Sequence, residues 1–274
     1  MERGEHHRLV DLEVDQSLVL TSFHQSPLPL ALVLRMAGVP TIAAVSVDYP
    51  GSLLDVRHRV DEDIHEVERG LSLVATLGYR LPEGDDGELR VRLGGRGDAP
   101  ELDGPYVVVH PGASVPARAW APERHRELVD ALVGAGRQVV VTGDASEREL
   151  TSMVAGQKRA GVVDLGGRVG LGGLAEVLSG AEVVVVGNTG PAHLAAAVGT
   201  PVVSLFSPVV PAVRWRPWGV PYELLGDQGA ACAGSRARVC PVAGHPCLDG
   251  VAVAEVVAAV ERLASLRQVE GVAG

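Results

Sequence analysis

The feature that most constrains this fold is a valine-rich run that recurs in the second half of the chain, each time followed by a turn and a helical pattern. The three clearest cases are YVVVHPG at 106–112, QVVVTGD at 138–144 and EVVVVGN at 182–188. Short continuous runs of β-branched residues are typical of strands buried on both faces, as in parallel sheets covered by helices. Strands that alternate with helices through short connections predict a doubly wound, Rossmann-like α/β domain.

The first part of the chain predicts a smaller unit of the same class. We expect strands at 17–23 and 41–47, a helix at 30–38 between them, and a second helix at 63–77. One βαβ unit and a helix are too few elements for a complete sheet. The stretch 81–105 is rich in Gly, Asp, Pro and Arg and contains at most one strand, ELRVRL at 88–93. We therefore predict a shortened N-terminal domain at 1–100 and a complete C-terminal domain at 101–274.

Composition excludes several classes of protein. No apolar run reaches the roughly 18 residues that a membrane-spanning helix needs, and the opening residues 1–16 are polar, with no secretory apolar segment. We expect no stable membrane insertion and a cytoplasmic location. The net charge of −10 and the pI of about 5.4 argue against nucleic acid as a partner. Three cysteines without an export signal do not predict a disulfide framework.

The turns after the three valine-rich strands carry the candidate site residues. Ligands of open parallel sheets bind outside the carboxyl ends of the strands, where glycine allows close approach and helix N-termini attract phosphate. Arg118 offers a bidentate contact to a diphosphate, and Glu147 offers acceptors for sugar hydroxyls. The alternative for each turn taken singly is that its polar residue only caps a helix. The candidate residues are Gly112, Ala113, Ser114 and Arg118 after the first strand, Thr142, Gly143 and Glu147 after the second, and Asn188, Thr189, Gly190, Pro191 and His193 after the third.

Four segments resemble one known family in their order and spacing. HPGASVPARAW, VVVTGDASERE, VVDLGG and LAEVLSGAEVVVVGNTGPAHLAAAVGTPVVSLFSP are similar to glycosyltransferase family 9, the ADP-heptose:lipopolysaccharide heptosyltransferases, over about 106–208. The resemblance implies a GT-B fold with an N-terminal acceptor domain and a C-terminal donor domain. It also implies inverting, metal-independent transfer from a nucleotide diphosphate sugar, ADP-heptose-like, to a hydroxyl of a glycan, lipid-linked or small-molecule acceptor. No cofactor and no bound metal are implied.

The sequence departs from the family pattern in ways that affect the predicted chemistry. Arg118 stands where the family has a lysine two residues before a tryptophan, and Asn188 stands where it usually has an aspartate. The uncharged amide of Asn188 is compatible with a preferred sugar other than heptose. The family's opening strand and Gly-Asp turn, whose aspartate is the usual candidate base, is not found. His24, in the loop SFHQSPLP, is the local candidate for the proton acceptor, and a plain hydrogen-bonding role is its alternative.

Three alternatives remain open at this point. The missing opening segment favours a nucleotide-sugar binding protein without transferase activity. A nucleotide-sugar epimerase or hydrolase of GT-B-like fold fits the same turns. Separately, the tail holds Cys232, Cys240, His245 and Cys247, which are the residue types of a closed zinc site. Their spacings of eight, five and two residues match no familiar zinc motif, so we predict no metal there.

Overall fold

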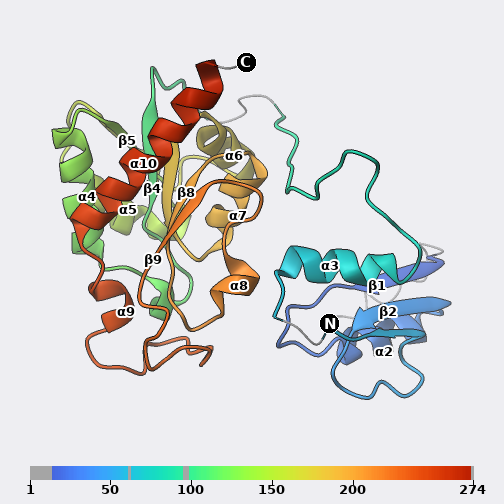
Figure 1. Cartoon of the computed structure of the whole chain (residues 1–274). Coiled ribbons are helices and arrows are strands. Elements are labelled where there is room, and N and C mark those ends of the chain that lie inside the picture. The colour runs from blue at the N-terminus through green and yellow to red at the C-terminus, as the bar shows by residue number, and fades with distance from the viewer. Residues whose placement is uncertain (1–13, 61–62, 95–98, 273–274) are drawn as a thin grey trace. The chain divides into compact units, whose positions relative to one another are not determined.

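The chain forms two compact units, Met1–Gly87 and Glu88–Gly274, in a computed structural model that describes residues 14–60, 63–94 and 99–272 (Figure 1). The predicted domain boundary at residue 100 falls inside the second unit. The segment before it belongs there because the Val91 N–H donates to the Ala197 carbonyl at 3.1 Å. Of the predicted loop 81–105, residues 95–98 lie outside the described residues, as do residues 1–13 of the polar opening segment.

The first unit contains a three-stranded parallel sheet in the order β1-β2-β3. Its helices pack apolar side chains on the sheet: Ala31 and Leu34 of the first helix share a core with Ile42 and Ala44. The predicted βαβ unit is confirmed. The elements are β1 (Gln16–Val19), α2 (Leu28–Met36), β2 (Thr41–Val45), β3 (Val56–His58) and α3 (Glu66–Ala75).

One strand prediction was wrong in extent, and the loop that was expected to hold at most one strand holds none at 88–93. The strand expected at 17–23 ends at Val19, which pairs with Ala44, and the chain then turns away from its neighbour. The stretch 88–93 forms no strand. Its alternation of charged and apolar residues is strand-like, but a strand also needs a partner, and the Val91 N–H bonds to the end of a helix instead.

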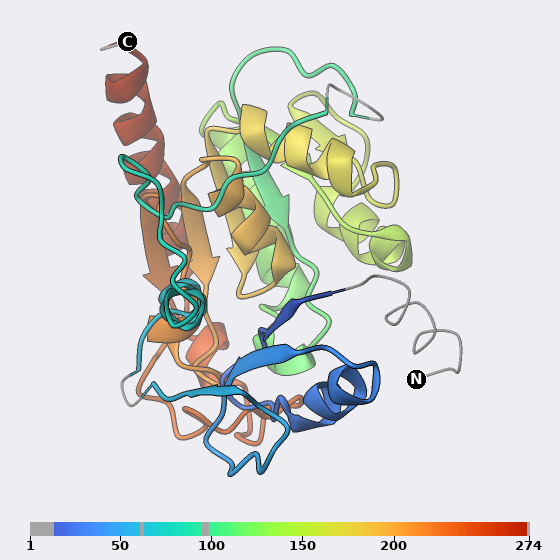
Figure 2. The ribbon, with the colours of Figure 1, turned by 90° about the vertical axis from the view of Figure 1, so that its right-hand side faces the viewer.

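The second unit contains a six-stranded parallel sheet in the order β6-β5-β4-β7-β8-β9, whose arrows share one direction (Figure 2). This confirms the doubly wound domain. The elements are β4 (Tyr106–His110), η1 (Pro116–Arg118), α4 (Pro122–Gly134), β5 (Gln138–Val141), η2 (Ala145–Glu147), α5 (Arg148–Ala155), β6 (Val162–Asp164), α6 (Leu171–Gly180), β7 (Val183–Gly187), α7 (Gly190–Ala197), β8 (Val202–Leu205), α8 (Ala212–Trp215), β9 (Tyr222–Leu225), α9 (Pro246–Asp249) and α10 (Val253–Val272).

Helices cover both faces of this sheet, which explains why its central strands are almost entirely valine. Figure 1 shows α4, α5 and α10 on one face and α6 and α7 on the other. Successive side chains point to opposite faces. Val107 and Val109 of β4 therefore pack with residues of α4, α5 and α10, while Val108 packs with residues of α6 and α7. No position on these strands faces water, so no polar alternation is needed.

The strand order places the topological switch point of the sheet, where the order of the strands reverses, between β4 and β7. After β4 the chain builds β5 and β6 to one side, and it then returns to place β7 on the other side of β4. Loops that leave neighbouring strands in opposite directions open a crevice at the carboxyl edge. The turns after β4 and β7 are therefore the expected walls of a ligand site. No helix in the described part of the chain has the length and apolar content to cross a bilayer.

Candidate functional site

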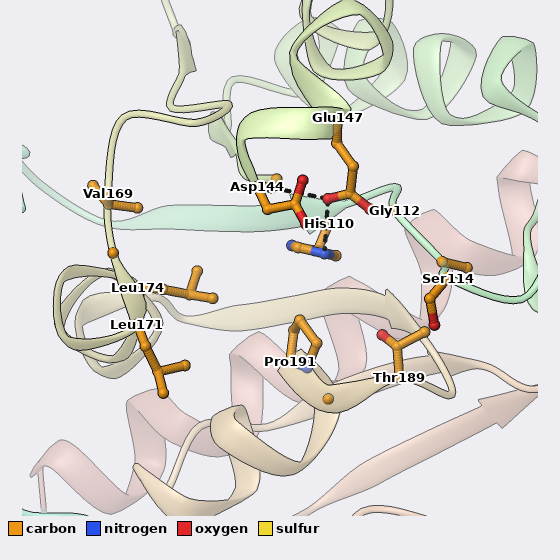
Figure 3. A pocket seen from close by; sticks show the side chains of 14 residues that line it. His110, Gly112, Ser114, Asp144, Glu147, Val169, Leu171, Leu174, Thr189 and Pro191 are labelled. Atoms are coloured by element: carbon orange, nitrogen blue, oxygen red, sulfur yellow. Dashed lines mark hydrogen bonds and ion pairs between the residues drawn. The ribbon is translucent and has the colours of Figure 1, made fainter. Parts of the chain in front are cut away.

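A cavity of about 410 Å³ lies at the carboxyl edge of the second sheet, at the topological switch point between β4 and β7 (Figure 3). It is built from the turns after β4, β5 and β7 and from the start of α6. Most of the predicted ligand-binding residues meet here, although they come from three separate turns. The lining residues are His110, Gly112, Ala113, Ser114, Gly143, Asp144, Glu147, Val169, Gly170, Leu171, Leu174, Thr189, Gly190 and Pro191.

One end of the cavity presents backbone N–H groups. Within the described part of the chain, none of the N–H groups of residues 112–114 donates to a protein acceptor. Thr189 is the N-cap of α7 and makes no side-chain capping bond, so the N–H of Gly190, the first helical residue, also stays unpaired. A cluster of free N–H groups at a turn and a helix N-terminus is a binding site for an anion.

The other end of the cavity is apolar. Figure 3 shows Val169, Leu171 and Leu174 at the end away from Ser114 and Thr189. Leu171 is 75% exposed, which is unusual for a leucine beside a cavity. The sequence carries no signal for this wall, because apolar residues at the start of a helix look the same whether they line a cavity or pack in a core. An apolar wall of this kind suits the face of a flat ring.

Glu147 projects into the cavity between these two ends. Its Oε2 accepts the N–H of Asp144 at 2.9 Å, which closes a capping box at the start of η2. Its carboxylate lies against Gly112: a Cβ at that position would be 2.0 Å from Oε1. Glycine at this position thus leaves room for the carboxylate, which a larger residue would displace. A second anion about 4 Å from this group would be opposed by on the order of 4 kcal/mol at an effective dielectric constant of about 20.

Asp144 also lines the cavity, but its carboxylate is already engaged. Oδ1 accepts the N–H of Ser146 at 2.7 Å and the hydroxyl of the same residue at 2.6 Å. These hydrogen bonds lower the pKa of Asp144 below its ordinary value. The group is therefore an ionised cap of η2 that accepts two hydrogen bonds on one oxygen, whereas Glu147 accepts one, on Oε2.

His110 lies behind Glu147 at the end of β4. Its Nδ1 is 3.0 Å from the Thr142 hydroxyl and its Nε2 is 3.8 Å from Glu147 Oε2. Burial lowers the pKa of His110 to about 4. Thr142, a predicted ligand contact, is completely buried, and its hydroxyl faces His110. The sequence signal for His110 was a polar residue closing a buried strand, but its role depends on neighbours from another strand.

Arg118 does not line the cavity but lies beside its anion-binding end. Its Nη1 donates to the carbonyl of Asn188 at 3.4 Å, and Asn188 directly precedes Thr189. Burial and the nearby charge of Arg238 lower the pKa of Arg118. Neither arginine has a carboxylate partner among the described residues. Arg238, whose carbonyl accepts the Ala117 N–H at 3.0 Å, was missed because it lies in the cysteine-bearing tail.

Comparison with known proteins identifies the family. Residues 13–244 match glycosyltransferase family 9 (heptosyltransferase). The chain belongs to glycosyltransferase family 9. Lipopolysaccharide heptosyltransferase 1 of Pseudomonas aeruginosa is 35% identical over 209 residues, which are 73% of this chain and 56% of that protein. The chain spans about half the length of the curated relatives it matches.

Solved structures of other family 9 proteins share the fold. E. coli ADP-heptose lps heptosyltransferase II has a TM-score of 0.74 at 22% identity, over 97% of this chain and 81% of that one. The family 9 glycosyltransferase from Veillonella parvula has a TM-score of 0.77 at 17% identity, over 96% of this chain and 80% of that one. The GT-B fold expected from the sequence is confirmed.

Two further residues of the family 9 pattern lie outside the cavity. Asn188 is 5% exposed, its Oδ1 accepts the Ser207 N–H at 3.4 Å, and its Nδ2 has no partner within the described ranges. His193 contacts the ring of Trp215, with centroids 6.0 Å apart. Both belong to the segment that forms the cavity wall: Asn188 directly precedes the lining residues 189–191, and His193 follows them by two positions.

In the first unit of this family 9 chain, His24 lines a separate cavity of about 260 Å³ at the carboxyl ends of β1 and β2. Its Nδ1 is 3.3 Å from the hydroxyl of Ser22. Ser26, Asp48 and Arg69 line the same cavity. His24 thus lies among polar groups at the edge of the first sheet.

The tail cysteines are arranged as packing and hydrogen-bonding residues. Cys232 and Cys247 are buried in the core beside α10, and the thiol of Cys240 donates to the Val242 carbonyl at 3.3 Å. His245 Nε2 lies 3.2 Å from the carbonyl of Ala117. Within residues 14–60, 63–94 and 99–272, no three His, Cys, Asp or Glu side chains are grouped to hold a metal ion.

Proposed function

We propose that this chain binds a nucleotide diphosphate sugar in the cavity of its second unit and transfers the sugar to an acceptor hydroxyl. The supporting observation is that one cavity joins an apolar wall to a group of unpaired backbone N–H groups. The base lies against Leu171 and Leu174, and the diphosphate lies at residues 112–114 and Gly190. A solved protein of the same fold is an ADP-heptose heptosyltransferase, which supports an ADP-sugar as the donor.

The transfer step develops negative charge on the leaving diphosphate as the bond to the sugar breaks. The backbone N–H groups at residues 112–114 and Gly190 point to a fixed place and stabilise that charge without reorganising. Arg118 adds a mobile cation, because it lies beside the N-terminus of α7 and has no carboxylate partner in the described part of the chain. Asn188 and His193 orient the sugar from the same segment.

The acceptor is a glycan, a lipid-linked sugar or a small molecule that carries a free hydroxyl. Its proton must pass to a base as the new bond forms. We assign this role to His24, which lines the cavity of the first unit. The acceptor oxygen bonds to the anomeric carbon as its bond to the diphosphate breaks, and this single displacement inverts the anomeric centre. Arg118 and the backbone donors offset the charge of the leaving diphosphate, so the transfer needs no metal. Unchanged rates with EDTA and an inverted anomeric signal in the product NMR spectrum are the expected results.

Donor binding is tested by thermal shift with ADP-, GDP-, UDP- and dTDP-sugars. A ligand at about 100 times its Kd stabilises the folded state by about 2.7 kcal/mol, which corresponds to a Tm rise of about 5–10 °C for a unit of this size. We expect this shift with an ADP-sugar. No shift with any of the four classes would contradict the proposed function.

Arg118→Ala tests the transfer step, with Arg124→Ala as the matched control. Arg124 is an exposed arginine on α4 that pairs with Glu127 at 3.2 Å, away from the cavity. Loss of one preorganised donor to a developing charge costs about 10²-fold in kcat, so Arg118→Ala should lose about that factor and Arg124→Ala should not. Wild-type donor binding and transfer in Arg118→Ala would refute the assignment.

A further inference from the structure

The ring of His110 has a defined neighbour at each nitrogen. The Thr142 hydroxyl lies 3.0 Å from Nδ1, and Glu147 Oε2 lies 3.8 Å from Nε2, as the dashed line in Figure 3 shows. Thr142 is completely buried and His110 is 7% exposed, so water has little access to the contact between them, whereas Glu147 is open to the cavity. The three side chains come from the ends of β4 and β5 and from η2, and they form one row that ends in the cavity.

The position of the ring proton follows from the charges around it. Burial lowers the pKa of His110 to about 4, so the ring is neutral near pH 7 and carries one N–H. With that proton on Nδ1, the lone pair of Nε2 would face the Glu147 carboxylate and be repelled. We therefore assign the proton to Nε2, which faces the carboxylate, while the Thr142 hydroxyl donates to Nδ1.

Glu147 keeps acceptor capacity on the cavity side. Oε2 accepts one backbone N–H, from Asp144, and Oε1 has no hydrogen-bond partner among the described residues. The carboxylate repels a phosphate but accepts hydrogen bonds from two neighbouring hydroxyls at once. In Figure 3 it lies between the apolar wall and the N–H groups near Ser114. In a nucleoside diphosphate, the part between base and phosphates is the ribose.

We propose that His110, held by Thr142, is a positioning residue that aims the Glu147 carboxylate at the vicinal hydroxyls of the donor's ribose. The inference rests on the proposed function. The His110 Nε2 lies 3.8 Å behind the carboxylate, beyond direct hydrogen-bonding distance, and acts on it through the dipole of its ring N–H. The bond from the Asp144 N–H holds Oε2 directly. The site then distinguishes ribonucleotides from deoxyribonucleotides.

The test measures the Kd of ADP and of 2′-deoxy-ADP by titration calorimetry and takes their ratio. For the wild type we expect ADP to bind about tenfold or more tightly, the loss of one charge-assisted hydrogen bond. His110→Leu and Thr142→Val should bring the ratio toward one. His110→Gln, which keeps an N–H near the Nε2 position, should retain much of the preference. Thr200→Val is the control, because Thr200 is equally buried and loses one bond, to the Leu178 carbonyl, away from the cavity.

The possible outcomes separate the two proposals. If the wild type binds neither nucleotide, the proposed function fails. If it binds both equally, or if His110→Leu keeps the wild-type ratio, the inference on His110 is overturned while donor binding stands. A purely structural role would weaken both nucleotides by the same factor and leave the ratio unchanged. Should His110→Leu fail to fold, the comparison of Thr142→Val with Thr200→Val decides.

Discussion

Gly112 and Glu147 provide the sharpest test of the site geometry, because a methyl group on one displaces the other. A Cβ at residue 112 would lie 2.0 Å from Glu147 Oε1, 2.3 Å from Cδ and 2.5 Å from Oε2, all well inside contact distance. The end of a glutamate side chain rotates easily, so we expect the carboxylate to swing out in Gly112→Ala. It then loses the bond from the Asp144 N–H.

The cost in stability follows from that lost bond. A capping hydrogen bond contributes about 1 kcal/mol, so Gly112→Ala should lower the free energy of unfolding by about that amount. Glu147→Ala removes the same bond and should cost about the same. In the double variant no carboxylate is left to displace, and the added methyl is neutral or slightly stabilising through the unfolded state. The coupling energy of the cycle is therefore about 1 kcal/mol.

Urea unfolding followed by tryptophan fluorescence measures this cycle. All three tryptophans, Trp120, Trp215 and Trp218, lie in the second unit, so the signal reports that unit alone. The corresponding change in Tm is about 2–4 °C for each single variant. If Gly112→Ala costs the same with and without Glu147, within about 0.5 kcal/mol, the two residues do not touch and the geometry of the cavity is wrong.

Two further predictions concern stability. Burial lowers the pKa of His125 to about 3 and of His110 to about 4, below the ordinary 6.5, so between these values and pH 6.5 the unfolded chain binds more protons. The free energy of unfolding should fall as the pH drops from 6.5, by up to about 1.4 kcal/mol per pH unit for each histidine. Urea unfolding midpoints at pH 7 and pH 5 measure this fall. In His125→Gln the free energy of unfolding should fall less between the two pH values. In Gly180→Ala a Cβ would lie 2.5 Å from the Tyr106 hydroxyl, so we expect the free energy of unfolding to fall by about 1–3 kcal/mol. Gly134→Ala is the control, because the space around Gly134 is open and its free energy of unfolding should not fall. Equal unfolding midpoints for the two glycine variants would argue against this packing.

Much of the fold could be predicted because its signals are local. A run such as EVVVVGN needs both faces covered, and the alternation with helical segments allows few arrangements other than a parallel sheet. The turns after these runs were placed on one edge of the sheet for the same reason. The structure brings Gly112, Glu147 and Thr189 to one cavity, as that reasoning expected.

The sequence left other features open. ELRVRL alternates like a strand, and the prediction allowed at most one strand there; residues 88–93 form none, and the Val91 N–H bonds to the Ala197 carbonyl at the end of α7. Thr142 followed a buried strand and was read as a ligand contact, but its hydroxyl faces His110. Which way a side chain points at the end of a strand depends on the packing around it, and the sequence does not state that packing.

By itself, the sequence determined the class of fold, the central valine-rich strands of the second sheet and the glycine turns at their ends, since each follows from hydrophobic pattern and backbone freedom within a few residues. Tertiary structure alone decided that Val169 and Leu174 form a wall, that Arg118 lies beside the cavity, and that Thr142, His110 and Glu147 stand in a row. These contacts join segments separated by 30 residues or more in several cases, and they exist only after the strands have taken their order in the sheet. Hydrogen bonds and charges act over a few ångströms, so the chemistry of the site appears only when the fold closes those distances.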